Sequence, residues 1–173
     1  MKTILNEHQL SITIQRLCHQ ILENHIDLEN TVLIGLQPRG IYLSERIAEQ
    51  LHKQLPSIKL LYGKLDITFY RDDIRKQLHV ANQTNISFSI ENKNVILIDD
   101  VLYTGRTIRA ALDALLDYGR PSKVELCTLI DRRFSRQLPI QPDYVGKAID
   151  SIISQKVIVY WREKDGREEV VLL

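Results

Sequence analysis

The chain lacks the features that mark several large classes of protein. It has 173 residues, only two of them cysteine, and 23 basic against 22 acidic residues leave a net charge of +1 at pH 7. So few cysteines cannot build the disulfide framework of a small secreted domain. The balanced charge gives no overall field toward nucleic acid or membrane surfaces, so any contact with RNA needs a local basic patch.

Long apolar segments are missing as well. No apolar run reaches membrane-spanning length, and the N-terminus lacks the apolar segment of a signal peptide. Cys18 and Cys127 lie in apolar-periodic surroundings, which predicts buried thiols in a reducing compartment. We therefore expect a cytoplasmic protein that does not associate with a membrane.

The apolar content is nevertheless sufficient for one core. Hydrophobic residues make up 44% of the sequence, and no repeat, low-complexity tract or linker divides residues 1–173, which indicates a single domain. Runs typical of strands alternate with helical periodicity, which predicts an α/β fold with a central, mostly parallel sheet flanked by helices. The predicted strands are 31–36, 58–70, 95–98, 124–130, 157–161 and 168–173, the predicted helices are 6–23, 41–51 and 108–116, and 139–148 is a predicted loop.

One strand is followed by residues that suit a phosphorylated sugar. Residues 95–98 are apolar, Asp99 and Asp100 follow where this strand should end, and residues 104–107 (Thr-Gly-Arg-Thr) open the next helix. The N–H groups of such a turn attract phosphate, and carboxylates accept hydrogen bonds from ribose hydroxyls or serve the hydration shell of a metal ion. Each piece alone is also typical of a solvated turn or a helix cap, but the combination favours the sugar phosphate.

Two further segments are expected at the same edge, because the carboxyl ends of parallel strands lie on one side of the sheet. Pro38 and Arg39 lie in the sharp break after the strand at 31–36, and Asp131 follows the strand at 124–130. Arg39 is either an anion ligand or only an exposed side chain.

A polar stretch separates residue 71 from residue 94. Apolar alternation returns at Ile86, Phe88 and Ile90, which predicts a mobile β-hairpin. This hairpin is either a lid over the site or a plain surface feature.

These segments resemble a known family. Residues 95–107 match the signature with which type I phosphoribosyltransferases bind 5-phosphoribosyl 1-diphosphate (PRPP). The sequence at 35–43, 66–73, 119–122 and 138–147 resembles the PyrR family of bifunctional pyrimidine operon regulators and uracil phosphoribosyltransferases. The resemblance implies a type I phosphoribosyltransferase core, a small hood built from the latter part of the chain, and a hairpin lid.

The same resemblance implies the roles of individual residues. Arg39 would clamp the departing diphosphate, and Arg71 on the lid would come near the same group. Asp99 and Asp100 would bind the ribose hydroxyls and hold, indirectly, a Mg²⁺ cofactor that arrives with PRPP. Asp100 is also a candidate general base or charge stabiliser, which makes Asp100 and Arg39 the implied catalytic residues. The implied PRPP-binding residues are Pro38, Arg39, Asp99, Asp100, Val101, Leu102, Tyr103, Thr104, Gly105, Arg106 and Thr107.

The choice of base rests on two positions at which this chain differs from phosphoribosyltransferases that use purines. In hypoxanthine-guanine phosphoribosyltransferases, which this chain resembles in the signature and at 142–146, an aspartate typically stands at the position of Tyr103 and a lysine at that of Asp131. A carboxylate repels a carbonyl oxygen but accepts from an N–H, so both departures favour a pyrimidine. The implied base-binding residues are Asp131, Tyr144, which would stack on the base, and Val145. We expect uracil and PRPP to give UMP, with a purine phosphoribosyltransferase as the alternative.

The family resemblance also implies binding to a messenger leader RNA. The basic candidates are Arg16, His19, Arg132, Arg133, Arg136 and Lys147. Residues 132–137 depart from the Asp-Arg-Gly-His-Arg-Glu of well-known members and are one residue longer. The chain is therefore either an enzyme that also regulates, or an RNA-binding regulator that keeps the pocket only as a nucleotide sensor. Family members are homodimers or larger homo-oligomers, and the same is expected here.

Overall fold

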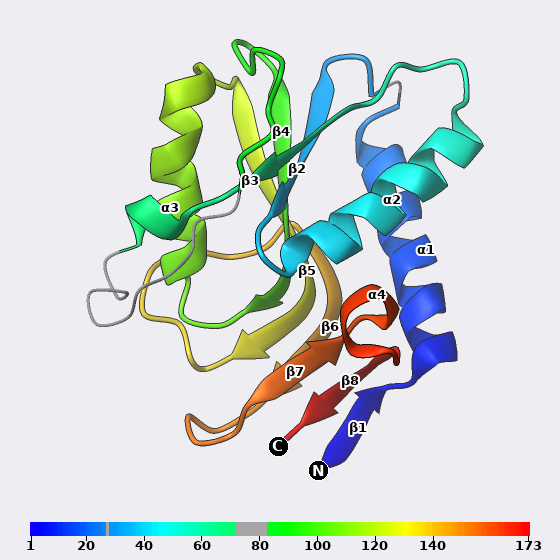
Figure 1. Cartoon of the computed structure of the whole chain (residues 1–173), viewed down its shortest axis with the longest axis vertical. Helices are drawn as coiled ribbons and strands as arrows, with labels where there is room; N and C mark the ends of the chain where they lie inside the picture. Colours follow the sequence, from blue (N-terminus) through cyan, green and yellow to red (C-terminus); the bar gives the residue numbers. More distant parts are fainter. Residues whose placement is uncertain (27, 72–82) are drawn as a thin grey trace.

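The computed structural model describes residues 1–26, 28–71 and 83–173 (Figure 1). Its centre is a five-stranded sheet in the order β3-β2-β4-β5-β6, and every neighbouring pair is parallel, which confirms the predicted sheet. The strands are β2 (Thr31–Leu36), β3 (Leu61–Leu65), β4 (Asn94–Leu102), β5 (Lys123–Arg133) and β6 (Tyr144–Asp150). Among them β2, which is buried along its whole length, has the predicted bounds.

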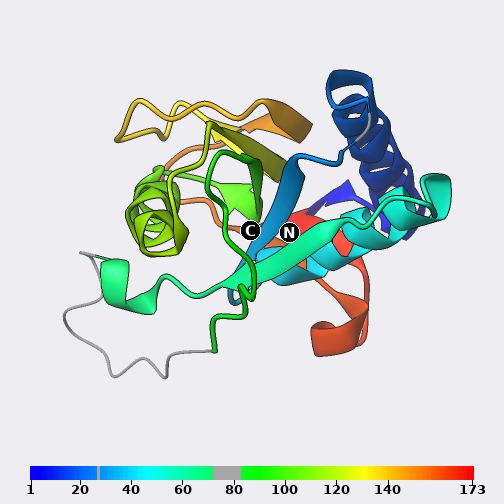
Figure 2. The same ribbon diagram turned by 90° about the horizontal axis from the view of Figure 1, so that it is seen from above.

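Helices cover both faces of this sheet, because alternate strand residues are apolar on each side. Helices α1 (Glu7–Asn24) and α2 (Gly40–Gln54) pack with Leu33, Ile96 and Ile98 on one face. Helix α3 (Arg106–Leu115) and the 3₁₀ helix η2 (Leu116–Tyr118) pack on the other face (Figure 2). No helix in the described ranges combines the length and the apolarity that crossing a membrane requires.

Helix boundaries follow the local signals in the sequence. Asn6 and Gln9 form the predicted capping box of α1, with the side chain of each accepting from the backbone N–H of the other. The apolar stripe expected on α3 is narrower than predicted. Leu112 is 39% and Leu116 70% exposed, because the face of α3 that meets the sheet is formed by Ile108, Ala110, Ala111, Ala114 and Leu115.

A second, antiparallel sheet forms the hood. It consists of β1 (Lys2–Leu5), β8 (Glu169–Leu172) and β7 (Val157–Tyr160), with the short helix α4 (Arg162–Asp165) between β7 and β8. The hood therefore contains the first strand of the chain as well as its latter part. The predicted turn at 165–166 is the end of α4, where Gly166 adopts a φ of 70°.

Two predicted elements differ in the structure. The strand expected at 58–70 spans only β3, because the Asp66 side chain accepts from the backbone N–H and hydroxyl of Thr68 and turns the chain into the 3₁₀ helix η1 (Thr68–Tyr70). Residues 144–148, predicted as loop, begin β6, which pairs with β5 and thereby gains ladder hydrogen bonds.

The predicted hairpin lies partly outside the described residues, at 72–82. Its returning arm is no strand where the structure describes it. Asn85 makes an isolated bridge to Lys64, while Ile90 is buried and Ile86 and Phe88 pack against the α3 side of the core. The alternation of these apolar residues in the sequence therefore reflects packing against the edge of the core, and not a β-strand.

Candidate active site

The two acids lie inside β4, not after it. The pairing of β2 with β4 ends at Gly35 and Ile98, whereas β4 continues beside β5 as far as Leu102 and Asp131. Beyond the end of β2, the start of α2 covers β4. A Cβ on Gly40 would lie 2.6 Å from the Ile98 carbonyl oxygen and 2.9 Å from the Asp99 Cα, so only glycine permits this approach.

Both carboxylates are buried, with Asp99 8% and Asp100 9% exposed. The Asp100 N–H donates to Asp99 Oδ1 at 2.9 Å. Burial raises the pKa of Asp99 well above 3.8, and the neighbouring Asp100 charge raises it further. Burial also raises the pKa of Asp100, although Arg39 opposes this shift. A cation or a set of hydroxyl donors would relieve both effects, and oxygen-only donors suit Mg²⁺.

The phosphate turn (Tyr103–Thr107) joins β4 to α3. Gly105 has a φ of 93°, a conformation that other residues adopt only with strain, and α3 begins at the next residue. The turn lines a cavity of about 310 Å³. Asp99, Val101 and Leu102 line the same cavity, as does Arg71 from the far side of β3. The structure thus brings these predicted PRPP-binding residues and the predicted lid arginine together.

Sequence reasoning missed Gln137, which also lines this cavity. Its backbone N–H donates to the Thr104 carbonyl at 3.0 Å, and its side-chain oxygen accepts from Arg106 Nε at 2.8 Å. Gln137 therefore ties the phosphate turn to the segment that follows β5. No local sequence signal identifies it, because its partners lie more than thirty positions earlier in the chain.

Arg39 follows Pro38 in the loop that precedes α2, and the Gln37–Pro38 peptide bond is cis. The Arg39 Nε lies 3.6 Å from Asp100 Oδ2. Its Nη2 donates to Asp165 Oδ2 at 2.8 Å and to the Val159 carbonyl oxygen. Arg39 is therefore at the acids, as predicted, and it is held by the hood.

Asp131 lies within β5, near its end, and contacts the phosphate turn through Arg136. One Arg136 nitrogen pairs with Asp131 and the other donates to the Tyr103 carbonyl oxygen. The Tyr103 ring lies under the Arg132 guanidinium, 3.9 Å from its centroid. Asp131 and Tyr103, the two residues that departed from the purine pattern, are thus neighbours.

Tyr144 does not reach this site, so its predicted stacking role is corrected. The ring is 2% exposed and lies in the core on the α1 side of the sheet. Its hydroxyl donates to Glu125 at 2.9 Å and accepts from Asn24. Val145 follows in β6, and its carbonyl accepts from Arg16 on α1. Neither side chain is among those that line the cavity at the phosphate turn.

The six basic candidates separate into two groups. Arg132 is 4% exposed and donates to Ser151 and to the Ile152 and Gln155 carbonyls, so it is a structural residue and not a surface ligand for RNA. Arg136 is half-buried and pairs with Asp131 and the Tyr103 carbonyl, so it too is engaged within the fold. The exposed candidates are Arg16, His19, Arg133 and Lys147.

No group of three or more His, Cys, Asp or Glu side chains suited to a metal ion occurs in the ranges that the structure describes. Asp99 lines the cavity at the phosphate turn and Asp100 follows it in β4, so these two carboxylates fit a metal ion bound together with a ligand phosphate.

Comparisons with known proteins define the class of protein. Residues 1–164 match the family described as phosphoribosyl transferase domain. Two solved hypoxanthine phosphoribosyltransferases share the fold. The one from Staphylococcus aureus has a TM-score of 0.74 at 21% identity, covering 98% of this chain and 90% of its own, and the one from Trypanosoma cruzi has 0.76 at 17%, covering 100% and 96%.

Relatives with higher sequence identity show to which phosphoribosyltransferases this chain belongs. The bifunctional protein PyrR of Elusimicrobium minutum is 46% identical, with 99% of this chain and 96% of that protein covered. The PyrR of a Picosynechococcus species is 47% identical, with 98% and 96% covered. The chain therefore belongs to the phosphoribosyltransferases and, among them, to the family of bifunctional PyrR proteins, which confirms the predicted resemblance.

Proposed function

We propose that this protein transfers the 5-phosphoribosyl group of PRPP to uracil, giving UMP and diphosphate. The observation that carries this proposal is that Asp99, Asp100, Arg39 and the phosphate turn meet at one end of the sheet. PRPP has three polar parts, and each has a matching partner there. The turn suits the 5-phosphate, the acids suit the ribose hydroxyls, and Arg39 suits the diphosphate.

The reaction exchanges one bond at C1 of the ribose. The C1–O bond breaks with its electron pair leaving on the diphosphate, the C1–N1 bond to uracil forms, and the N1 proton passes to a base, for which Asp100 is the candidate. Positive charge develops on the ribose during this exchange, so buried carboxylates beside it stabilise the transition state, and Arg39 stabilises the leaving anion. Mg²⁺ bound with PRPP would neutralise part of the diphosphate charge, with Asp99 and Asp100 holding its hydration shell.

The pair of Asp131 and Arg136 supports the choice of uracil. The uracil edge presents an N–H donor between carbonyl acceptors, and this pair presents a carboxylate acceptor beside guanidinium donors. The hypoxanthine phosphoribosyltransferases compared above share the fold at 21% identity or less, so they do not argue for a purine here.

A panel of bases tests the proposal directly. Labelled PRPP is incubated with uracil, hypoxanthine and guanine, and UMP is the expected nucleotide. In Asp131→Asn the KM for uracil should rise about tenfold, the loss of roughly one charged hydrogen bond. Asp113→Asn, an exposed acid of α3 that pairs only with Arg109 in the part of the chain described, is the matched control. Faster use of either purine by the wild type would refute the proposal.

Regulation through a leader RNA is the second candidate function. The exposed Arg16 and His19 lie on α1, and Lys147 lies on the adjoining β6, where Arg16 donates to the Val145 and Gly146 carbonyls. These side chains are a local basic edge on a chain of nearly neutral charge. Anisotropy titrations with the leader RNA at several salt concentrations should show salt-sensitive binding that UMP strengthens. Binding weakened by Lys147→Ala but not by Lys53→Ala would support this edge, and indifference to UMP would reject regulation.

We also propose a cytoplasmic homodimer or larger homo-oligomer. Phe134, Ile152 and Ile153 line one surface cavity and are 85%, 66% and 80% exposed, and such a contiguous apolar patch is typical of a protein–protein interface. Sedimentation equilibrium tests the assembly, and a monomer at micromolar concentration would overturn it.

A further inference from the structure

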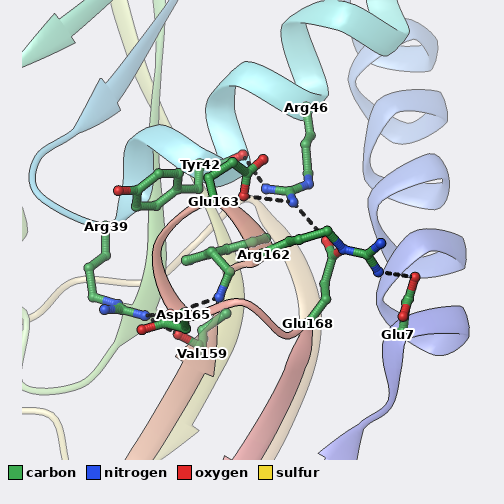
Figure 3. A network of polar contacts seen from close by, with 10 residues as sticks. Glu7, Arg39, Tyr42, Arg46, Val159, Arg162, Glu163, Asp165 and Glu168 are labelled. Atoms are coloured by element: carbon green, nitrogen blue, oxygen red, sulfur yellow. Dashed lines mark hydrogen bonds and ion pairs between the residues drawn. The ribbon is translucent and has the colours of Figure 1, made fainter.

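Asp165 is the last residue of α4 in the hood, far along the chain from the PRPP signature. Its carboxylate nevertheless reaches the loop before α2, where Oδ2 accepts from Arg39 Nη2 at 2.8 Å (Figure 3). The same nitrogen donates to the Val159 carbonyl oxygen at the end of β7. Arg39 is thus held from the hood by two acceptors.

The Asp165 carboxylate is itself held in place by hydrogen bonds. Asp165 Oδ2 also accepts from the Trp161 N–H at 2.9 Å, and the Asp165 N–H donates to the Trp161 carbonyl at 2.7 Å. Trp161 is fully buried and lies against α2, with the Arg46 guanidinium 4.6 Å from its ring centroid. Because Trp161 anchors α4 to α2, Asp165 keeps a constant position relative to the loop that holds Arg39.

This arrangement leaves one nitrogen of the guanidinium for a ligand. Nη2 is occupied by the hood, and Nε lies 3.6 Å from Asp100. Within the described residues Nη1 has no hydrogen-bond partner, and the Arg39 side chain is 27% exposed. Nη1 is therefore the guanidinium nitrogen that remains to donate to a diphosphate oxygen.

We propose that Asp165 is a positioning residue, which fixes the Arg39 guanidinium so that its Nη1 nitrogen receives the diphosphate of PRPP. The inference rests on the proposed function. Hydrogen bonding from Trp161 and the charge of Arg39 hold the pKa of Asp165 below 3.8, so it stays ionised and paired at neutral pH.

The test compares Asp165→Asn with the wild type by steady-state kinetics. Asparagine keeps an acceptor for the Trp161 N–H and removes the charge that orients Arg39. The KM for PRPP and the inhibition constant of diphosphate should both rise about tenfold, while kcat and the KM for uracil change less than about threefold. Glu163→Gln is the matched control on the same helix, because its partner Arg46 also pairs with Glu168 at 2.8 Å.

A double-mutant cycle separates positioning from general stability. In the Arg39→Ala background, Asp165→Asn should add no more than about a twofold change in the KM for PRPP. A full tenfold change in that background would overturn the proposal, as would an unchanged or lowered KM in the single variant. A lowered KM would mean that Asp165 withholds Arg39 from the substrate.

The measurements distinguish failure of the proposed function from failure of the positioning role. A wild type that makes no UMP refutes the proposed function, whereas an active wild type with an unaffected Asp165→Asn refutes only the positioning role. Should Asp165→Asn fail to fold, the same cycle is run with Asp165→Glu, whose added methylene displaces the carboxylate from Nη2, and the same kinetic outcomes decide.

Discussion

Carboxylates are buried near both ends of the parallel sheet. Asp99 and Asp100 lie in β4 toward its carboxyl end, and Glu125 lies in β5 toward its amino end, where it is 4% exposed. Glu125 has a full set of partners, namely His25 at 2.6 Å, Tyr144 and Lys123. Asp99 and Asp100 lie near two arginines, with Arg39 Nε 3.6 Å from Asp100 and the charge of Arg71 opposing the rise in the pKa of Asp99.

The pKa values of the two groups shift in opposite directions. Burial raises the pKa of Glu125, but the hydrogen bonds from Lys123, His25 and Tyr144 outweigh burial and lower it below 4.5. For Asp99 and Asp100, toward the carboxyl end of the sheet, the effect of burial is the larger one, and the pKa of both lies above 3.8. A buried carboxylate whose charge is fully compensated by partners stabilises the fold, whereas one whose charge is only partly compensated costs stability and is typical of a ligand site.

The largest expected effect comes from removing the aspartate pair. Asp99→Asn with Asp100→Asn should lower the rate of UMP formation by more than about a hundredfold, because the carboxylates that face the ribose are lost. The free energy of unfolding at pH 7 should stay equal or increase, since two buried charges are removed. Activity assays and urea unfolding measure both. Near-normal activity would show that these acids do not bind PRPP.

Removing the satisfied carboxylate should give the reverse result. Glu125→Gln leaves His25 and Lys123 without their anion, and we expect a loss of about 2 kcal/mol in the free energy of unfolding. UMP formation should stay within about twofold, because the site lies at the other end of the sheet. Lys93→Ala, a change of a half-buried surface side chain near the same end, is the control for urea unfolding. A stability equal to the wild type would contradict the structural role of Glu125.

Local sequence patterns predicted the structural features that depend on residues close together in the chain. The apolar run at 31–36 gave β2 because every residue is buried in the middle of the sheet, and the capping box placed the start of α1. The signature at 95–107 placed the acids next to the phosphate turn, since that geometry is continuous along the chain. The strand β1 was missed because it is short and its partner β8 lies at the opposite end of the sequence.

The remaining site contacts depend on tertiary packing. Arg136 meets Asp131 across the turn that follows β5, and Asp165 meets Arg39 across 126 positions. Tyr144 was assigned to the wrong environment because residues 139–148 lack a clear strand pattern, and only the pairing of β6 with β5 fixes the face on which its ring lies.

A smaller effect is expected from Tyr144→Phe. This change removes only the hydroxyl, which donates to Glu125 at 2.9 Å and accepts from Asn24 at 3.3 Å. The free energy of unfolding should fall by about 1 kcal/mol, the net value of one buried hydrogen bond. A ring that served to stack on a base would lose no stability on this change, so urea unfolding decides between the two roles.

The finest distinction lies in how stability varies with pH. A carboxyl whose pKa falls on folding stabilises the protein above its ordinary value and ceases to do so as the pH falls, so the cost of Glu125→Gln should shrink below pH 4.5. A carboxyl whose pKa rises on folding contributes most below its ordinary value and loses that contribution as the pH rises. The stability gained by replacing Asp99 and Asp100 should therefore vanish below pH 3.8 and grow above it. Urea unfolding of both variants and the wild type between pH 3 and 8 tests this opposition, and curves of the same sign would mean that the two ends of the sheet hold their carboxylates in the same way.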